Sequence, residues 1–278
     1  MALESLDDLL LRSDNDAVWE LFHENSKTSL VEPHPTYRLW PSEGAIVGMM
    51  RRLRRVKPYR DFPKIALPRE WPASRLGFDE VVAGRRTARG FGAGSVALEQ
   101  LAKVLALSYG VNRDNAGTPF TRPFRTVPSG GALYPLEIYL AAARIEGLQP
   151  GLYHYDPEDH ALDALRPGED PAQIAALLVQ RDLALGAAAI VLITAVFFRS
   201  TFKYGDRGYR FVLLEAGHLA QNANLVAQEM GLATTNVGGF ADRAVDRHLG
   251  LDGLNESTLY VLLLGPAGEQ EPVSNDWI

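Results

Sequence analysis

Residues 190–230 read IVLITAVFFRSTFKYGDRGYRFVLLEAGHLAQNANLVAQEM, and they contain the strongest secondary-structure signals in the chain. Residues 190–198 form an unbroken β-branched and aromatic run, which is typical of a strand buried on both faces. Residues 208–230 are rich in alanine and stop at Gly231, which predicts one long helix. Several short apolar side chains along that helix would let another helix approach closely; they are Ala216, Leu219, Ala223, Val226 and Ala227.

Further helices and strands are predicted around this stretch, without a regular alternation. The spacing of apolar residues from Leu98 to Tyr109 predicts a helix with Ser95 as its N-cap and Gly110 at its end. The other predicted elements are a strand at 138–143, a hairpin of 153–155 and 161–162, a helix at 172–179 and a strand at 259–264. The sequence has no internal repeat. This mixture predicts an α+β protein.

The first 73 residues differ in composition from the rest. Residues 1–30 have apolar side chains at roughly helical spacing, and residues 32–73 contain seven of the 17 prolines. Because proline removes a backbone donor and restricts the residue before it, this second stretch cannot be one long helix. We expect an N-terminal arm over 1–73, packed on a main domain over 74–278. The basic run at 51–55 is interpreted as a solvated face, with contact to an acidic partner as the alternative.

Composition excludes several classes of protein. The chain has 278 residues, and its 34 acidic against 28 basic side chains give a net charge of −6, which argues against a general nucleic-acid binder. It has no cysteine, so disulfides, thiolate catalysis and iron–sulfur clusters are excluded. The longest uncharged run, residues 183–198, is too short for a membrane span, and the acidic N-terminus does not resemble a signal peptide. A cytoplasmic protein without membrane or nucleic-acid partners is expected.

The histidines do not predict a metal site. No His-x-x-x-His pair exists, and the two Glu-x-x-His steps are Glu20/His23 and Glu215/His218. A di-iron bundle would need two further glutamates on neighbouring helices, which the sequence does not offer. We interpret both steps as polar pairs on helices and expect no metal.

Three segments have residues suited to chemistry, and the first is Arg85-Arg86-Thr87-Ala88-Arg89. On a helical turn, Arg85 and Arg89 would lie on one face with the Thr87 hydroxyl nearby. Planar guanidinium groups suit a phosphate monoester, which accepts paired N–H bonds. The alternative is a solvated helix start.

The second segment is Arg125-Thr126-Val127-Pro128-Ser129-Gly130-Gly131-Ala132-Leu133-Tyr134-Pro135. Two prolines stiffen its flanks, while adjacent glycines leave bare backbone between them. Such a loop would let N–H groups and the Ser129 hydroxyl approach a flat polar ligand. The alternative is an ordinary turn.

The third segment, residues 202–210, has the sequence FKYGDRGYR and follows the buried strand. Loops at strand ends often present catalytic groups. Lysine and tyrosine side chains ordinarily lose a proton only at a pKa of about 10, so Lys203 or Tyr204 would need burial or neighbouring cations to act as a base near neutral pH. Arg207 and Arg210 could supply those cations. The alternative is a basic surface loop.

Together these segments resemble the flavin-dependent nitroreductase superfamily, and within it the SagB-type dehydrogenases of azole-peptide biosynthesis. The family's Arg-Arg-Ser/Thr-x-Arg step is matched at 85–89, and its Pro-Ser-Gly/Ala-Gly-Ala-Leu-Tyr-Pro loop is matched in full at 128–135. A Gly-x-Tyr-x-Tyr step at 151–155 and a Lys-Tyr step before Arg-Gly-Tyr-Arg at 203–210 also match. The resemblance covers about residues 75–265. It implies a mostly antiparallel sheet flanked by helices.

The resemblance also implies an FMN enzyme that is a homodimer, with each flavin at the subunit interface. The residues expected to hold the phosphate and ribityl chain are Arg85, Arg86, Thr87 and Arg89. The residues expected to line the flavin ring from the partner subunit are Pro128, Ser129 and Gly130. Backbone N–H groups of Gly238 and Gly239 are expected to face the same ring. One departure is that residues 268–278 lack the basic pair that many nitroreductases bring to the phosphate.

The implied reaction is oxidation of a thiazoline or oxazoline ring to the aromatic azole. The ring loses a proton to a base and a hydride to the flavin, and oxygen reoxidises the flavin. We assign the base to Lys203, with Tyr204 assisting or exchanging roles with it. The substrate is an azoline on a peptide or on a carrier protein, and other synthetase subunits are potential partners. The alternatives are a general NAD(P)H-dependent nitro- or quinone reductase and a flavin-free scaffold subunit.

Overall fold

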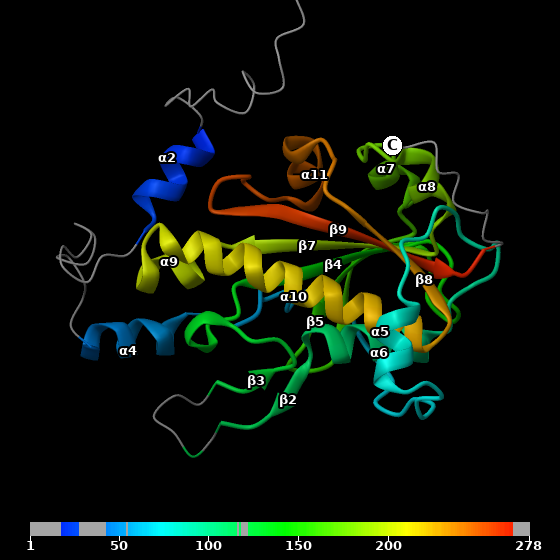
Figure 1. The fold of residues 1–278 in the computed structure, drawn as a ribbon, viewed down its shortest axis with the longest axis horizontal. Coiled ribbons are helices and arrows are strands. Elements are labelled where there is room, and N and C mark those ends of the chain that lie inside the picture. Colours follow the sequence, from blue (N-terminus) through cyan, green and yellow to red (C-terminus); the bar gives the residue numbers. More distant parts are fainter. Residues whose placement is uncertain (1–17, 28–42, 54, 116, 118–121, 269–278) are drawn as a thin grey trace, which may run out of the picture.

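The computed structural model describes residues 18–27, 43–53, 55–115, 117 and 122–268 (Figure 1). The helices in these ranges are α2 (Val18–Asn25), α4 (Glu43–Arg52), α5 (Phe78–Gly84), α6 (Leu98–Tyr109), η1 (Gly130–Ala132), α7 (Ala172–Ala175), α8 (Arg181–Gly186), α9 (Phe198–Tyr204), α10 (Arg207–Glu229) and α11 (Asp242–Leu249). The strands are β1 (Lys64–Ala66), β2 (Val111–Arg113), β3 (Phe124–Arg125), β4 (Leu136–Ala142), β5 (Gly151–Asp156), β6 (Ala161–Pro167), β7 (Ala189–Val196), β8 (Leu232–Val237) and β9 (Glu256–Pro266). The predicted α+β class is confirmed.

Seven strands form one sheet in the order β1-β6-β5-β4-β7-β9-β8, and every pairing in it is antiparallel. Strand β7 lies inside the sheet, where Ile193 pairs with Ile138 on one side and Tyr260 on the other. Seven of its eight residues are buried, as the unbroken apolar run predicts. The hairpin predicted around residues 156–159 is the pair β5–β6.

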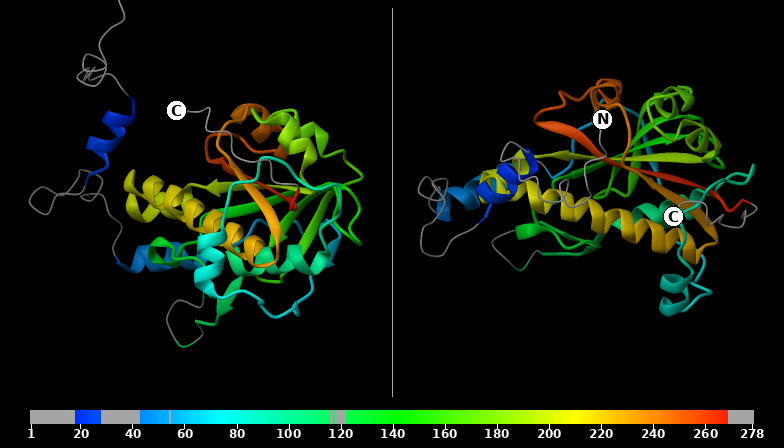
Figure 2. Two further views of the ribbon diagram at one scale, coloured as in Figure 1. Left: turned by 45° about the vertical axis from the view of Figure 1, so that its right-hand side comes forward. Right: turned by 45° about the horizontal axis from the view of Figure 1, so that its top comes forward.

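Helices cover both faces of this sheet (Figures 1 and 2). One apolar core lies beneath α6 and α10, and a second lies beneath α7, α8 and α11. Strand β4 contributes to both cores because its side chains alternate: Ile138 and Leu140 face α6 and α10, whereas Tyr139 and Ala141 face the other layer. The long helix α10 was predicted to within a residue at each end.

The N-terminal region is joined to the sheet. Strand β1 lies within the predicted arm and pairs with β6 as the outer strand, where Lys64 contacts Asp156 at 2.8 Å. Helix α4 is held at its C-terminal end by Arg122, whose guanidinium donates to the carbonyl of Met50 at 2.9 Å and of Leu53 at 3.0 Å. Part of the predicted arm therefore belongs to the sheet of the main domain. The domain boundary at residue 73 stays a prediction.

Several local predictions were wrong. The N-cap of α6 is Ala97 rather than Ser95, and the Gln100 side chain accepts a hydrogen bond from the Ala97 N–H. The helix expected at 172–179 is the single turn α7. Residues 202–210 are a helical corner between α9 and α10 rather than a loop.

The helical segment predicted over residues 1–30 is described only at 18–27, where α2 is helical as expected, and Arg54 of the basic run lies outside the described residues.

In the part of the chain that the structure describes, no helix is both long and apolar enough to cross a membrane.

Candidate functional site

The predicted Lys-Tyr step lies against the predicted glycine loop. Helix α9 ends at Tyr204, and Gly205 then turns the chain into α10. A methyl group placed on Gly131 would lie 2.6 Å from Tyr204 Oη and 2.7 Å from Lys203 Nζ. Both polar atoms therefore converge on one backbone position, which only glycine leaves open. We call Lys203, Tyr204 and Gly131 the Lys-Tyr cluster.

The neighbouring loop residues shape this cluster. Gly130 packs on the ring of Phe211 from α10, and a Cβ there would lie 3.2 Å from that ring. The same ring contacts Tyr204 edge-on, with centroids 4.9 Å apart. Pro128 is exposed and Ser129 is half-buried. The loop therefore places bare glycine backbone and the Ser129 side chain beside Lys203 and Tyr204.

The buried carboxylate of Glu215 lies beneath the loop and was missed as a functional group. Glu215 accepts a hydrogen bond from Tyr109 Oη at 2.8 Å, and the Ser129 hydroxyl lies nearby. Burial raises the pKa of Glu215 to about 7, against the opposing effects of these two hydroxyls and of Arg125. The Glu-x-x-His spacing predicted a polar pair of Glu215 with His218, but His218 is exposed.

The two arginines that follow the Lys-Tyr step bind the N-terminal arm. Arg207 donates to the Ser26 carbonyl at 3.1 Å, and Arg210 donates to Ser26 Oγ at 2.8 Å and to the His23 carbonyl at 2.5 Å. These carbonyls are at the C-terminal end of α2, where cations are favoured. The arginines therefore fasten α2 to α10, a role that the sequence did not indicate.

A second buried charge network lies under α9. Arg199, one turn before Lys203, donates to Glu137 at 2.6 Å. His154 lies between Glu137, at 2.8 Å, and Asp163, at 3.0 Å. Burial opposes charging of His154, but these two carboxylates raise its pKa, while Arg199 and His154 lower the pKa of Glu137 to about 2. The network fixes α9, and with it Lys203, to the sheet.

The predicted phosphate segment lies at the outer strand β8. It is extended rather than helical: Arg85 follows the end of α5 with φ −61° and ψ 126°, and Thr87 bridges Thr234 in parallel. The Ala88 N–H donates to the Thr234 carbonyl at 2.9 Å. Pairing with β8 therefore overrides the helical turn expected from the arginine spacing. Thr87 and Arg89 are exposed beside the strand.

The predicted glycine pair directly follows β8, whose last residues are Asn236 and Val237. Gly238 is exposed, and a Cβ there would meet no atom within 4 Å. Gly239 instead packs against Val179. The Oδ1 atom of Asn236 is buried and has no hydrogen-bond partner among the described residues. We call Arg85, Arg86, Thr87, Arg89, Asn236, Gly238 and Gly239 the β8-edge cluster.

The two clusters are not brought together within one chain. The Lys-Tyr cluster lies at the N-terminal end of α10, whereas Gly84, just before the β8-edge cluster, packs against Gln228 at its C-terminal end. The helix has 23 residues, so its ends are about 34 Å apart. Arg85, at the start of the β8-edge cluster, therefore lies roughly one helix length from the Lys-Tyr cluster of the same chain.

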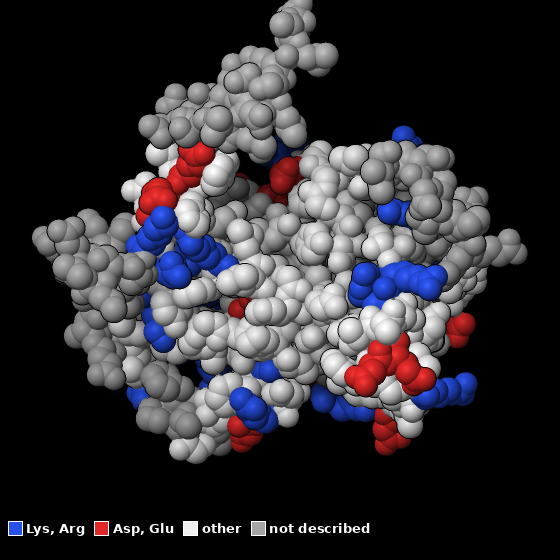
Figure 3. Space-filling view, in the orientation of Figure 1, with Lys and Arg blue, Asp and Glu red and all other residues white. Residues whose placement is uncertain are grey.

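The face of α10 between the clusters is largely uncharged. Leu213 and Leu214 are 42% and 60% exposed, and Gly217 near the middle of the helix has open space above it. Figure 3 shows this surface as mostly white, with Lys and Arg gathered near both ends of α10. Apolar surface of this kind is typical of a contact with another protein.

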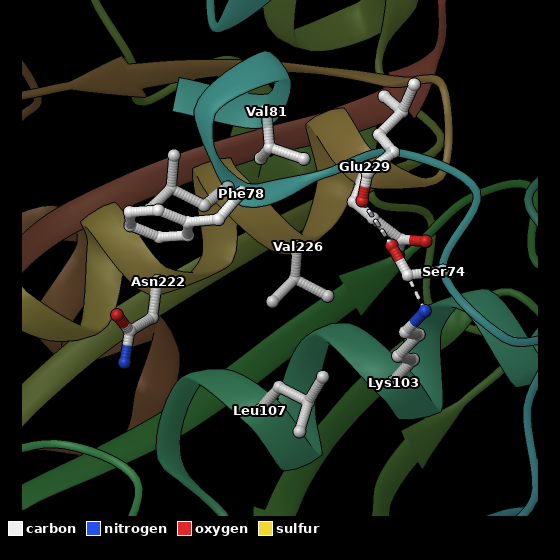
Figure 4. A pocket seen from close by; sticks show the side chains of 10 residues that line it. Ser74, Phe78, Val81, Lys103, Leu107, Asn222, Val226 and Glu229 are labelled. Carbon is white, nitrogen blue, oxygen red and sulfur yellow. Dashed lines mark hydrogen bonds and ion pairs between the residues drawn. The ribbon is translucent and has the colours of Figure 1, made fainter. Parts of the chain in front are cut away.

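A groove of about 400 Å³ lies beside this face, between α5, α6 and α10 (Figure 4). Apolar side chains such as Phe78, Leu107 and Val226 line it. Its charged residues are paired with each other: Lys103 contacts Glu229 at 2.5 Å. The groove contains none of the predicted site residues and has the character of a packing surface. Among the described residues, no group of three or more His, Asp or Glu side chains could hold a metal ion.

Comparison with known families identifies the fold. A family model described as the nitroreductase family matches residues 82–265. The chain belongs to the nitroreductase family. The nitroreductase-like fold expected from the motifs is thereby confirmed, and the family is one of oxidoreductases.

Two relatives and one solved structure extend this result. The chain is 34% identical to the protein MJ1384 of Methanocaldococcus jannaschii, named a nitroreductase, over 76% of this chain and 98% of that protein. It is 34% identical to the microcin B17-processing protein McbC of Escherichia coli, over 53% of this chain and 56% of McbC. A chain of the E. coli microcin synthetase McbBCD complex, with truncated pro-MccB17 bound, superposes with a TM-score of 0.57 at 24% identity, covering 96% of this chain and 99% of that one.

Proposed function

We propose that the protein is an FMN-dependent dehydrogenase that oxidises thiazoline or oxazoline rings of a peptide to thiazoles or oxazoles. The observation that carries this proposal is the convergence of Lys203 Nζ and Tyr204 Oη on Gly131, inside the Pro-Ser-Gly-Gly loop. The similarity to McbC supports it, since that protein processes a microcin peptide. A ring oxidation of this kind requires one base beside the acidic ring carbon, which this cluster offers.

The β8-edge cluster fits FMN. Its three guanidinium groups and the Thr87 hydroxyl suit a phosphate and a ribityl chain. The open side of Gly238 admits a flat ring, and the buried, unpartnered Asn236 Oδ1 suits an N–H donor such as the imide of a flavin. When bound, FMN supplies hydride acceptance, with reoxidation by oxygen.

A homodimer would complete the site. A two-fold axis across the middle of α10 would place the two helices antiparallel, so that each Lys-Tyr cluster meets the partner's β8-edge cluster. Gly217 would allow close approach at the crossing, and Leu213 and Leu214 would be buried there. In this arrangement Pro128, Ser129 and Gly130 reach the ring from the other subunit.

Proton removal is assigned to the Lys-Tyr cluster. Lys203 Nζ takes the proton from the ring carbon and Tyr204 Oη orients or shares it, or the two exchange roles. Both atoms occupy the space where a Gly131 side chain would lie, which brings them close to each other. Gly131 is exposed, and Lys203 and Tyr204 are half-buried, so the cluster is accessible to a ligand.

The substrate is proposed to be a peptide, with other synthetase subunits as partners. The McbBCD complex with its bound precursor supports both points by analogy in fold. A carrier-bound azoline is the alternative substrate.

Substitutions in the Lys-Tyr cluster test the assignment. Lys203→Ala and Tyr204→Phe should each lower turnover of a thiazoline peptide at least about 100-fold while FMN stays bound, because positioned proton transfer contributes about 10²–10⁴-fold. Lys64→Ala, on the outer strand β1, is the matched control and should keep wild-type turnover. Near-wild-type rates for both cluster variants would show that the base lies elsewhere.

A nitro- or quinone reductase is a second candidate, favoured by the similarity to MJ1384 across nearly all of that protein. Rapid reduction of the bound flavin by NADH or NADPH, with no reaction of azoline peptides, would support it. A colourless protein that does not take up added FMN would instead support a scaffold subunit.

A further inference from the structure

The loop at 128–135 adopts an unfavourable backbone conformation. Ala132 and Tyr134 have φ values of 53° and 47°, in the left-handed region that side chains with a Cβ rarely adopt, and Gly131 between Gly130 and Ala132 has φ 65°. The Cβ of each such non-glycine residue is crowded against the backbone, which is unfavourable. A structure that retains two of them needs compensating interactions that hold the loop in place.

Those interactions meet at Glu215. The Tyr134 N–H donates to Ser129 Oγ at 3.0 Å, and that hydroxyl faces Glu215. On the other side, the Leu136 N–H donates to Tyr109 Oη at 3.1 Å, and that hydroxyl donates to Glu215 at 2.8 Å. One carboxyl group from α10 therefore binds the hydroxyl that holds the end of the strained loop and lies against the hydroxyl at its start.

The groups that face Glu215 come from three elements besides α10. They are Tyr109 of α6, Ser129 of the loop and Arg125 of β3. The Arg125 guanidinium lies over the Tyr109 ring at 4.4 Å and donates to the Arg55 carbonyl at 3.0 Å. Glu215 itself is 2% exposed. It thus has one cation nearby but no direct ion pair among the described residues.

We propose that Glu215 is a positioning residue that holds the loop, and with it Gly131, against Lys203 and Tyr204 through its bond to the Tyr109 hydroxyl and its contact with Ser129, and that its ionisation loosens the loop. The role in catalysis rests on the proposed function, but the hold on the loop does not. Opening the loop would hydrate the carboxyl, which favours its charged form. The closed loop therefore binds the proton more tightly, and closure weakens as pH rises through the pKa of the buried group.

The size of the effect follows from the two pKa values. The closed-state pKa is about 7 and the ordinary value is 4.5. Because the open loop releases the proton at a lower pH than the closed loop, the equilibrium constant for loop opening should rise about tenfold between pH 6 and pH 8. A neutral glutamine at this position keeps one carbonyl acceptor and the same shape but cannot ionise.

Hydrogen exchange measured by mass spectrometry on the full chain, without flavin or substrate, tests the proposal independently of catalysis. After correction for intrinsic rates, amides at 129–134 should exchange about tenfold faster at pH 8 than at pH 6, while those of β7 do not change. Glu215→Gln should exchange at the slower rate at both pH values. Glu229→Gln, the same change at the other end of α10, should keep the wild-type step.

Two results would overturn the proposal. One is a wild-type loop whose corrected exchange is equal at both pH values, a measurement that needs no variant. The other is a pH step that persists in Glu215→Gln. A purely structural role gives this second result, accompanied by faster exchange throughout α10 in Glu215→Gln.

Discussion

Replacing Gly131 with alanine tests whether the bare backbone at this position is what lets Lys203 and Tyr204 act together. The added methyl group would lie 2.6 Å from Tyr204 Oη and 2.7 Å from Lys203 Nζ, closer than Cβ contacts allow. Both atoms are at the ends of side chains, so these side chains should move rather than the backbone. The φ of 65° adds about 1–2 kcal/mol of backbone strain.

The expected result is a small loss of stability with a large loss of rate. The midpoint temperature of thermal unfolding should fall by a few degrees, since a loss of about 1 kcal/mol lowers it by about 2–4 °C in a protein of this size. Turnover of a thiazoline peptide should fall about 100-fold, because a displacement of about 1 Å in a catalytic group has effects of that order. Bound FMN should be retained.

Gly147→Ala is the matched control. Gly147 has φ 73°, so alanine meets similar backbone strain there, but no atom lies within 4 Å of its Cβ position. This variant should lose the same stability and keep its turnover. If Gly131→Ala and Gly147→Ala were equally active, the convergence at Gly131 would have no catalytic meaning.

Three further predictions concern assembly, pH and the charge network. Because Leu214 is 60% exposed on the proposed contact face, Leu214→Arg should give a monomer that no longer retains FMN, measured by light scattering and absorption. A dimer with bound FMN would place the interface elsewhere. Because burial raises the pKa of Glu215 from 4.5 to about 7, the protonated carboxyl stabilises the folded state fully below pH 4.5, and this contribution is lost by about pH 7. In denaturant titrations, the free energy of unfolding of wild type relative to Glu215→Gln should therefore fall by about 3 kcal/mol between these pH values. A difference that does not change with pH would argue against this. Glu137→Gln breaks a buried pair with Arg199 and should cost about 3–5 kcal/mol in the same assay; a loss below about 1 kcal/mol would show that the network does not fix α9.

Strong periodic signals in the sequence predicted the central elements. The apolar run of β7, the long helix α10 and the hairpin β5–β6 are confirmed because their patterns reflect burial in the sheet and its helical layer. Weaker signals failed where tertiary contacts decide the conformation. Residues 85–89 are extended because they pair with β8, and residues 202–204 are helical because α9 packs on the sheet through Arg199.

The sequence predicted individual residues of the site but not their arrangement in space. Sequence motifs named Lys203, Tyr204 and the glycine loop, and the structure brings these together. They gave no sign that Glu215 supports the loop, since a glutamate within a long helix resembles any solvated position. Nor could spacing show that His154 is held between two carboxylates from neighbouring strands, because strand register is a long-range property.

Anaerobic reaction of the FMN-loaded protein with a thiazoline-bearing peptide is the most direct test of the proposed activity. The absorption band of the oxidised flavin should bleach as the thiazole forms, in wild type but not in Lys203→Ala, which should still bind FMN. A wild-type flavin that is bleached by NADPH but never by the thiazoline peptide would contradict the proposal and identify a reductase.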